Sequence, residues 1–227
     1  MAKKKKPTRK ELLKKEDEFL TLSRRAINFF TLHLKFFKIA GLVLVLIAAT
    51  YIAGHFYIRS VNRKGQNAYN LAYYTLTKEN RVTLDAKTLE KSEKLFQKVR
   101  DEFGMSKAAR LALPQLALMA FTRKKYGDAA DLYREFLDTV KREPAYDSLT
   151  RLALAGCHEA KGELKTAIEV LDPVLSRPES RFRELAMLRM ARLYRLAHMP
   201  SKEQAVNRKF VREYPASPFL PVVKARL

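Results

Sequence analysis

The chain has 227 residues, of which 47% are hydrophobic and 30% are charged, a balance that excludes a collagen-like or uniformly disordered polymer. Its formal net charge of +21 raises nucleic acid as a partner, but the position of the charges matters more than their sum. Gly and Pro number only 7 and 9 and strand-type alternation is scarce, so we expect an all-α protein rather than a β-sandwich or barrel.

The first 38 residues are strongly basic, since twelve Lys or Arg stand against four acidic residues. We expect the opening stretch, MAKKKKPTRK, to be drawn to anionic lipid headgroups, where each basic residue contributes about 1 kcal/mol. In residues 16–38 bulky apolar residues stand among Arg24, Arg25 and Lys35, as in an amphipathic helix that lies along a membrane. Nucleic-acid binding by this tail is the less favoured alternative, because attraction to anionic lipid headgroups already accounts for a lysine run beside a membrane span.

An uncharged apolar run begins at Ile39, reads IAGLVLVLIAATYIA and continues to Ile58. Twenty helical residues cover about 30 Å, the thickness of bilayer hydrocarbon, so residues 39–58 are predicted to form one transmembrane helix. A buried helix of a soluble core fits less well, because the flanks differ greatly in charge. The positive-inside rule places residues 1–38 in the cytoplasm as a basic tail and exports the remainder. We expect an uncleaved anchor, a linker at residues 59–64 and a repeat domain at residues 65–227.

Four segments after the span repeat a helix–turn–helix pattern at intervals of 37 or 38 residues. Each has a small residue in its second helix, and bulky residues follow on the same helical face four and seven positions later in the first three segments. In the two central segments another small residue stands twelve positions earlier, in the first helix. The residues predicted to pack the repeats, with one turn glycine among them, are Ser92, Phe96, Ala117, Ala129, Tyr133, Ala155, Gly162, Ala167, Leu171, Ala191, Tyr194 and Ala205.

This pattern resembles the tetratricopeptide repeat, in which small and bulky residues recur at these offsets and a proline closes each unit. The resemblance implies an all-helical solenoid of about four helix pairs. An irregular helical bundle is the alternative, because the outer two segments match the pattern less well. In the fourth segment the pattern expects a small residue at Glu203, and the small residue present is Ala205.

The sequence contains no glycine-rich phosphate loop, no His-Glu-x-x-His and no Gly-x-Ser-x-Gly, so we expect neither an enzyme nor a bound cofactor. Cys157 is the single cysteine, which excludes an intramolecular disulfide, and the four histidines form no metal-binding constellation. Cys157 and His158 adjoin on one helix, where neighbouring side chains point about 100° apart. A structural thiol is therefore favoured over a nucleophile.

A solenoid of this kind presents its first helices on a concave face that suits peptides or partner helices. Extrapolation of the repeat pattern predicts that this groove is lined by Leu118, Phe121, Glu159, Met187 and Tyr194. Every third residue of one first helix is an arginine, which predicts a basic stripe of Arg189, Arg192 and Arg195. Either the stripe is an ordinary solvated helix face, or it contacts acidic segments or lipid headgroups.

A basic tail, one span and an exported repeat array together resemble the single-span proteins of bacterial inner membranes typified by the ancillary subunit of the Sec translocon. This resemblance implies a periplasmic adaptor, without catalytic residues, that passes emerging chains from the export channel to chaperones. The alternative is an envelope-organising protein whose basic domain binds anionic polymer or lipid. Salt separates the two hypotheses, because a contact carried by net charge weakens steeply as ionic strength rises.

Overall fold

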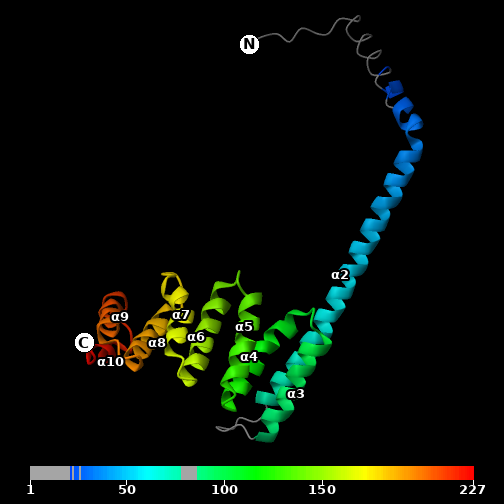
Figure 1. The fold of residues 1–227 in the computed structure, drawn as a ribbon. Helices are drawn as coiled ribbons and strands as arrows, with labels where there is room; N and C mark the ends of the chain where they lie inside the picture. Colours follow the sequence, from blue (N-terminus) through cyan, green and yellow to red (C-terminus); the bar gives the residue numbers. More distant parts are fainter. Residues whose placement is uncertain (1–20, 22, 26, 78–85) are drawn as a thin grey trace, which may run out of the picture. The chain divides into compact units, whose positions relative to one another are not determined.

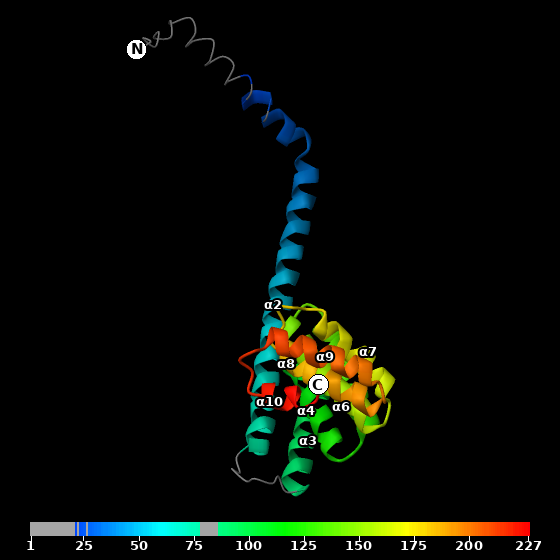
Figure 2. The same ribbon diagram turned by 90° about the vertical axis from the view of Figure 1, so that its left-hand side faces the viewer.

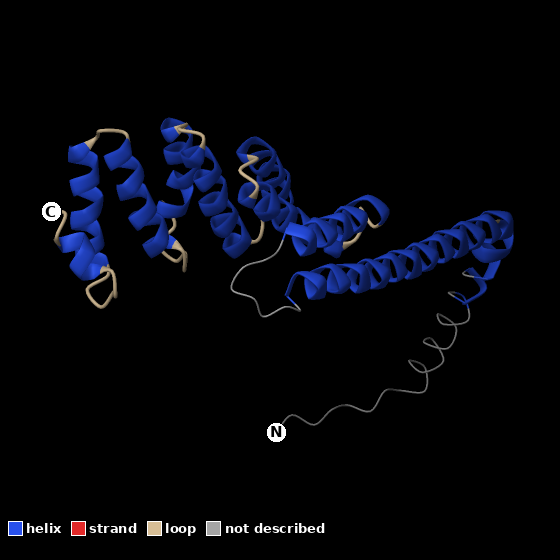
Figure 3. Ribbon diagram, turned by 90° about the horizontal axis from the view of Figure 1, so that it is seen from below, coloured by secondary structure: helices blue, strands red, loops and turns tan. Residues whose placement is uncertain are grey.

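The computed structural model describes residues 21, 23–25, 27–77 and 86–227, so most of the predicted tail lies outside the described residues. Over these residues the chain forms helices and no strands (Figure 3), which confirms the predicted fold class. Two compact units are present, Met1–Tyr57 and Ile58–Leu227. The helices are α2 (Leu34–Thr77), α3 (Ala86–Glu102), α4 (Lys107–Thr122), α5 (Tyr126–Thr139), α6 (Pro144–Ala160), α7 (Leu164–Leu175), α8 (Arg183–Leu196), α9 (Pro200–Glu213) and α10 (Leu220–Lys224).

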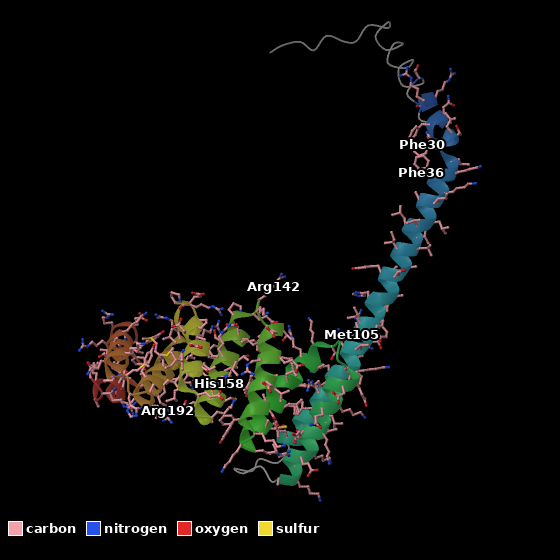
Figure 4. The ribbon with its side chains drawn as sticks, viewed as in Figure 1. Phe30, Phe36, Met105, Arg142, His158 and Arg192 are labelled. Carbon is pink, nitrogen blue, oxygen red and sulfur yellow. The ribbon has the colours of Figure 1, made fainter. Side chains whose placement is uncertain are left out.

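The N-terminal unit contains the apolar half of α2. Its side chains are exposed on every side, for example at Leu42, Ile47 and Tyr51, and Phe30 and Phe36 project near the start of this stretch (Figure 4). An 18-residue window of α2 has a mean hydropathy of 2.2 and none of it is buried. Among the described residues α2 is the one helix long and apolar enough to cross a membrane.

The predicted linker at residues 59–64 is wrong, because α2 continues through these residues to Thr77. The segment RSVNRK contains neither Pro nor Gly, so nothing in it ends a helix. Asn62 in its middle accepts a hydrogen bond at 2.9 Å through its side-chain oxygen from the backbone N–H of Lys107, the first residue of α4. These residues are therefore part of the repeat domain rather than a spacer.

In the second unit the last turns of α2 pair with α3, and α4–α5, α6–α7 and α8–α9 follow as antiparallel pairs stacked in a row (Figure 1). The predicted solenoid of about four pairs is confirmed. In the pairs α4–α5, α6–α7 and α8–α9 the two helices are joined by a turn with one left-handed residue, and these residues are Lys124, Gly162 and His198, with φ of 61°, 78° and 56°. In each turn the next N–H bonds back to the carbonyl five residues earlier at 2.9 Å, which ends the helix in the same way.

The small residues predicted in the second helices lie fully buried at the first three repeats, at Ser92, Ala129 and Ala167. Ser92 also donates a hydrogen bond at 2.9 Å to the carbonyl of Ala72 in α2, so its hydroxyl is satisfied inside the core. Bulky side chains such as Phe96 and Leu171 fill the space beside these residues. The remaining packing residues of the first helices, Ala117, Ala155 and Ala191, are buried as well.

In the last pair the assignment of Ala205 to the core is wrong, because Ala205 is exposed. The inward-facing positions are Glu203, Asn207 and Phe210, which keep the four- and seven-residue offsets of the other repeats. Glu203 is tolerated at the small position because its carboxylate lies 3.7 Å from the guanidinium of Arg195. The partner lies in α8, so the ion pair joins the two helices of this last pair.

Candidate peptide-binding groove

A groove of about 660 Å³ opens on the first helices of three successive pairs, α4, α6 and α8. Its walls are mainly apolar and contain Phe121 of α4, Ala160 of α6 and three leucines of α8. Those leucines, Leu185, Leu188 and Leu196, are spaced so that they lie along one face of the helix. The groove is thus a single apolar surface shared by three repeats.

The charged side of the groove is formed by one carboxylate and two guanidinium groups. Arg192, labelled in Figure 4, donates from Nε to Oε1 of Glu159 at 2.7 Å, and Arg189 Nη1 lies 3.9 Å from the other oxygen. The Glu159 side chain is only 13% exposed, whereas that of Arg192 is 58% exposed. The groove therefore keeps one positive charge in excess, carried by an arginine that solvent or a ligand can reach.

Gly156 leaves room for the guanidinium of Arg189 beside Glu159. A Cβ atom at position 156 would lie 2.8 Å from Nη1 of Arg189, which is closer than non-bonded atoms approach. The absent side chain therefore lets the Arg189 guanidinium lie against α6, one turn before Glu159.

Of the five residues predicted to line the groove, the structure places Phe121 and Glu159 in it. Met187 is buried in a core cluster with Phe210 and Val223, so its assignment to the groove is wrong. Tyr194 packs against the core between α7 and α8, with Lys202 Nζ 5.7 Å from its ring centre, and does not line the groove either. Leu118 is exposed on α4, one turn before Phe121, but outside the groove lining.

The predicted stripe of three arginines is not a free basic surface. Arg189 and Arg192 flank Glu159, and Arg195 faces Glu203, so each guanidinium has a carboxylate nearby. The leucines of α8 were missed by the sequence reasoning. Their spacing of three and eight residues, interleaved with Arg189 and Arg192, is the signal that would have found this mixed face.

Cys157 and His158 lie inside the repeat domain rather than in the groove. Burial raises the pKa of the Cys157 thiol to about 11, and the residue is fully buried. Oε2 of Glu163 lies 2.6 Å from His158 Nδ1, and Arg134 Nη2 lies 3.4 Å from Nε2, so both ring nitrogens have a polar partner. Among the described residues no group of His, Cys, Asp or Glu is arranged to hold a metal ion.

Cys157 is expected to resist thiol reagents in the folded chain. With a pKa of about 11, only about one thiol in a thousand is ionised at pH 8, and burial blocks access as well. The reaction with Ellman's reagent should be at least about 100-fold slower in native buffer than in denaturant, because the ionised fraction of the thiol is that much smaller in the folded chain than in an exposed cysteine. Native-state labelling as fast as that of free cysteine would show that the thiol is accessible.

An ion pair at the last repeat predicts a pH dependence. Arg183 hydrogen-bonds Glu213 and also donates to the carbonyl of Leu175 at 2.9 Å, which ties α7, α8 and α9 together. The Arg183 hydrogen bond lowers the pKa of Glu213 below its ordinary value of 4.5. The ionised carboxylate therefore stabilises the fold above pH 4.5, and this contribution is lost as the pH falls through the lower folded-state pKa.

Glu213→Gln should accordingly lower the urea midpoint at pH 7 and lose less stability than the wild type when the pH is lowered below 4.5. Glu179→Gln is the matched control, because Glu179 is exposed and has no ion pair among the described residues. Parallel pH profiles for wild type and Glu213→Gln would show that this pair does not stabilise the fold.

A solenoid of helix pairs with a groove across its first helices defines a repeat scaffold of the kind that typically binds proteins and carries no catalytic site. The family of tetratricopeptide repeat-like domains matches residues 34–175, more than half of the chain, and the protein belongs to this family. Two crystal structures of nearly identical TPR-like repeats, from a putative kinesin light chain of Podosopora anserina, are similar in fold. Each has a TM-score of 0.55 and 14% identity, and each match covers 71% of this chain and 82% of the other. No curated protein matches the sequence.

Proposed function

We propose that this protein is a membrane-anchored adaptor whose repeat domain binds segments of partner proteins. The anchor is residues 39–58, which lie in the exposed, apolar part of α2. A helix that buries none of its apolar surface in protein is stable in lipid and would be a liability in water. The tetratricopeptide-like fold supports the adaptor role, because its concave face is a typical protein-binding surface.

The observation that carries the proposal is the groove between α4, α6 and α8. Phe121, Leu185 and Leu188 offer an apolar wall, and the excess positive charge beside Glu159 favours a carboxylate on the ligand. The groove therefore suits a peptide segment that combines bulky apolar side chains with an acidic residue.

We place the repeat domain in the periplasm, with the basic tail in the cytoplasm and the anchor in a bacterial inner membrane. The support is the charge asymmetry, since twelve basic residues precede the span. The resemblance of this architecture to the ancillary subunit of the Sec translocon supports a position beside the protein-export channel. The partners there would be channel subunits and periplasmic chaperones.

Leu185→Glu is expected to weaken partner binding about tenfold. Crosslinking and pull-down from membranes should capture channel subunits or chaperones with the wild type and about tenfold less with the variant, because a carboxylate disrupts the apolar wall. Leu149→Glu is the matched control, since Leu149 is 49% exposed and outside the groove, while Leu185 is 47% exposed. Equal capture by all three forms would contradict the groove, and a catch without channel subunits or chaperones would contradict the placement at the translocon.

Protease added to intact spheroplasts tests the orientation. The repeat domain should be degraded while the tail is protected. If the repeat domain survives the protease, the periplasmic placement is overturned.

A further inference from the structure

One exposed face of α9 is rich in positive charge. Four exposed cationic side chains, Lys202, Arg208, Lys209 and Arg212, follow one another at helical spacing around the exposed Ala205. Figure 2 shows the repeat domain from its C-terminal end, with α9 and α10 towards the viewer. Together these four residues form a basic face on the last helix pair.

The equivalent faces of the two preceding second helices have the opposite charge. Counted from the buried small position of each repeat, the residues of α5 that correspond to this basic face and to Ala205 are Asp128, Asp131, Arg134, Glu135 and Asp138. The corresponding face of α7 contains Glu169 and Asp172 and no cation. The same surface thus changes from acidic to basic between α7 and α9. The corresponding face of α3 is also basic, but there Lys94 and Lys98 are paired with Glu90 and Glu102.

Among the residues that the structure describes, the cations of the basic face also lack a close carboxylate partner, although Lys202 lies over the ring of Tyr194. On α5, Asp131 is bonded to Arg134 at 2.5 Å, and Glu135 to Arg100 at 2.9 Å. On α9 the two carboxylates are engaged elsewhere, Glu203 with Arg195 and Glu213 with Arg183. Within the described part of the chain, none of the four cations lies within 4 Å of a carboxylate oxygen.

The short helix α10 and its flanks add exposed apolar side chains at the same end of the domain. Phe219, Val222 and Leu227 are each about half exposed, and Lys224 and Arg226 stand between them in sequence. Only Val223 of this segment is buried, where it closes the core cluster with Phe210. Basic residues next to exposed Phe, Val and Leu are typical of surfaces that bind the interface of an anionic membrane.

We propose that the basic face of α9, with the exposed apolar residues around α10, binds the anionic headgroups of the bilayer in which the chain is anchored. This inference rests on the membrane anchor of the proposed function. Because the same chain carries the anchor, the basic face meets the bilayer at a high effective concentration, so even modest contacts become effective. The exposed apolar residues favour lipid over a polyanion without an apolar interior.

The test uses the full chain in phospholipid nanodiscs, either of phosphatidylcholine alone or of phosphatidylcholine with phosphatidylglycerol. A spin label at Ala205→Cys reports the basic face, and one at Asp131→Cys reports the equivalent position of α5. Cys157 is buried and does not compete for the label. Anionic nanodiscs should increase the docked fraction at Ala205→Cys and leave Asp131→Cys unchanged, and added salt should reverse the change.

Charge reversal gives the size of the effect. Lys209→Glu with Arg212→Glu should lower the docking equilibrium at least about tenfold, since each charge near an anionic surface contributes about fivefold. Lys87→Glu with Lys91→Glu is the matched control, because it makes the same change in net charge on the exposed surface of α3.

The outcomes separate this inference from the anchor. If the chain co-isolates with the nanodiscs but the Ala205 label responds equally to both lipid compositions, the inference is overturned and the anchor stands. If the chain does not co-isolate with either nanodisc, the anchor is overturned and the inference with it. If the label is immobilised by RNA or an acidic polypeptide but not by anionic lipid, the basic face serves a different partner and the inference is overturned.

Discussion

Phe136→Ala is expected to lower the free energy of unfolding of the repeat domain by about 3–5 kcal/mol, the range for truncation of a buried phenylalanine. Phe136 is almost fully buried in α5 and packs with Leu113 of α4 and Val140. Its ring also meets that of Tyr146 in α6 edge-on, with centroids 6.0 Å apart. Alanine would leave a cavity between two successive repeats, and in a solenoid such an interface carries much of the cooperativity.

The measurement is urea unfolding followed by far-ultraviolet circular dichroism. Leu118→Ala is the control, because Leu118 is 52% exposed on the adjoining helix, and its truncation should change stability by less than about 0.5 kcal/mol. The interpretation fails if the two variants lose equal stability. A fall in the urea slope of Phe136→Ala, with an unchanged midpoint, would instead mean that the repeats have uncoupled.

The sequence predicts the central repeats well because their pattern and their packing have the same physical origin. A small residue is needed where two helices approach, and a bulky one is needed beside it. The pairs Ala129 with Tyr133 and Ala167 with Leu171 therefore identify the buried face of each helix from the sequence. A core contact of this kind depends on residues within one helix pair, which lie close in sequence. The pattern therefore reaches the correct fold without knowledge of distant contacts.

The same pattern misplaces residues at the last repeat and in the groove for a specific reason. Glu203 stands at a small position because Arg195 of the paired helix is in reach of its carboxylate. Met187 is apolar like a groove residue, but only the structure shows that Phe210 and Val223 cover it. Residues at the end of an array have neighbours that the repeat does not define.

Charge is the property that the sequence predicts least well. The arginines at 189, 192 and 195 look like a stripe in sequence, yet carboxylates of neighbouring helices lie close to all three. Four cations without a close carboxylate among the described residues lie on α9, because its two carboxylates pair with arginines of α8. Which charges are neutralised depends on pairs between different helices, and periodicity within a helix does not contain that information.

Gly65→Val is expected to destabilise the packing of α2 on α4 by about 2–3 kcal/mol. A Cβ at position 65 would lie 2.6 Å from Ser106 Oγ and 3.1 Å from the Cβ of Phe103, so the chain must shift. Ser106 cannot simply move aside, because its hydroxyl accepts a hydrogen bond from the N–H of Ala109 at 3.0 Å and so caps α4. A glycine inside a helix normally weakens it, and Gly65 is explained by the close approach of α2 to Ser106.

Hydrogen exchange in α2 and α3, together with the urea midpoint, measures this effect. Gly54→Val is the matched control in the same helix, because nothing lies within 4 Å of a Cβ at position 54. Ser106→Gly removes the two closest atoms, Oγ and Cβ of Ser106, leaves only the Phe103 contact at 3.1 Å, and keeps most of the cap, since glycine is itself tolerated at the N-cap position. The double variant should therefore recover most of the lost stability, and simple additivity of the two changes would rule out direct contact as the reason for glycine at position 65.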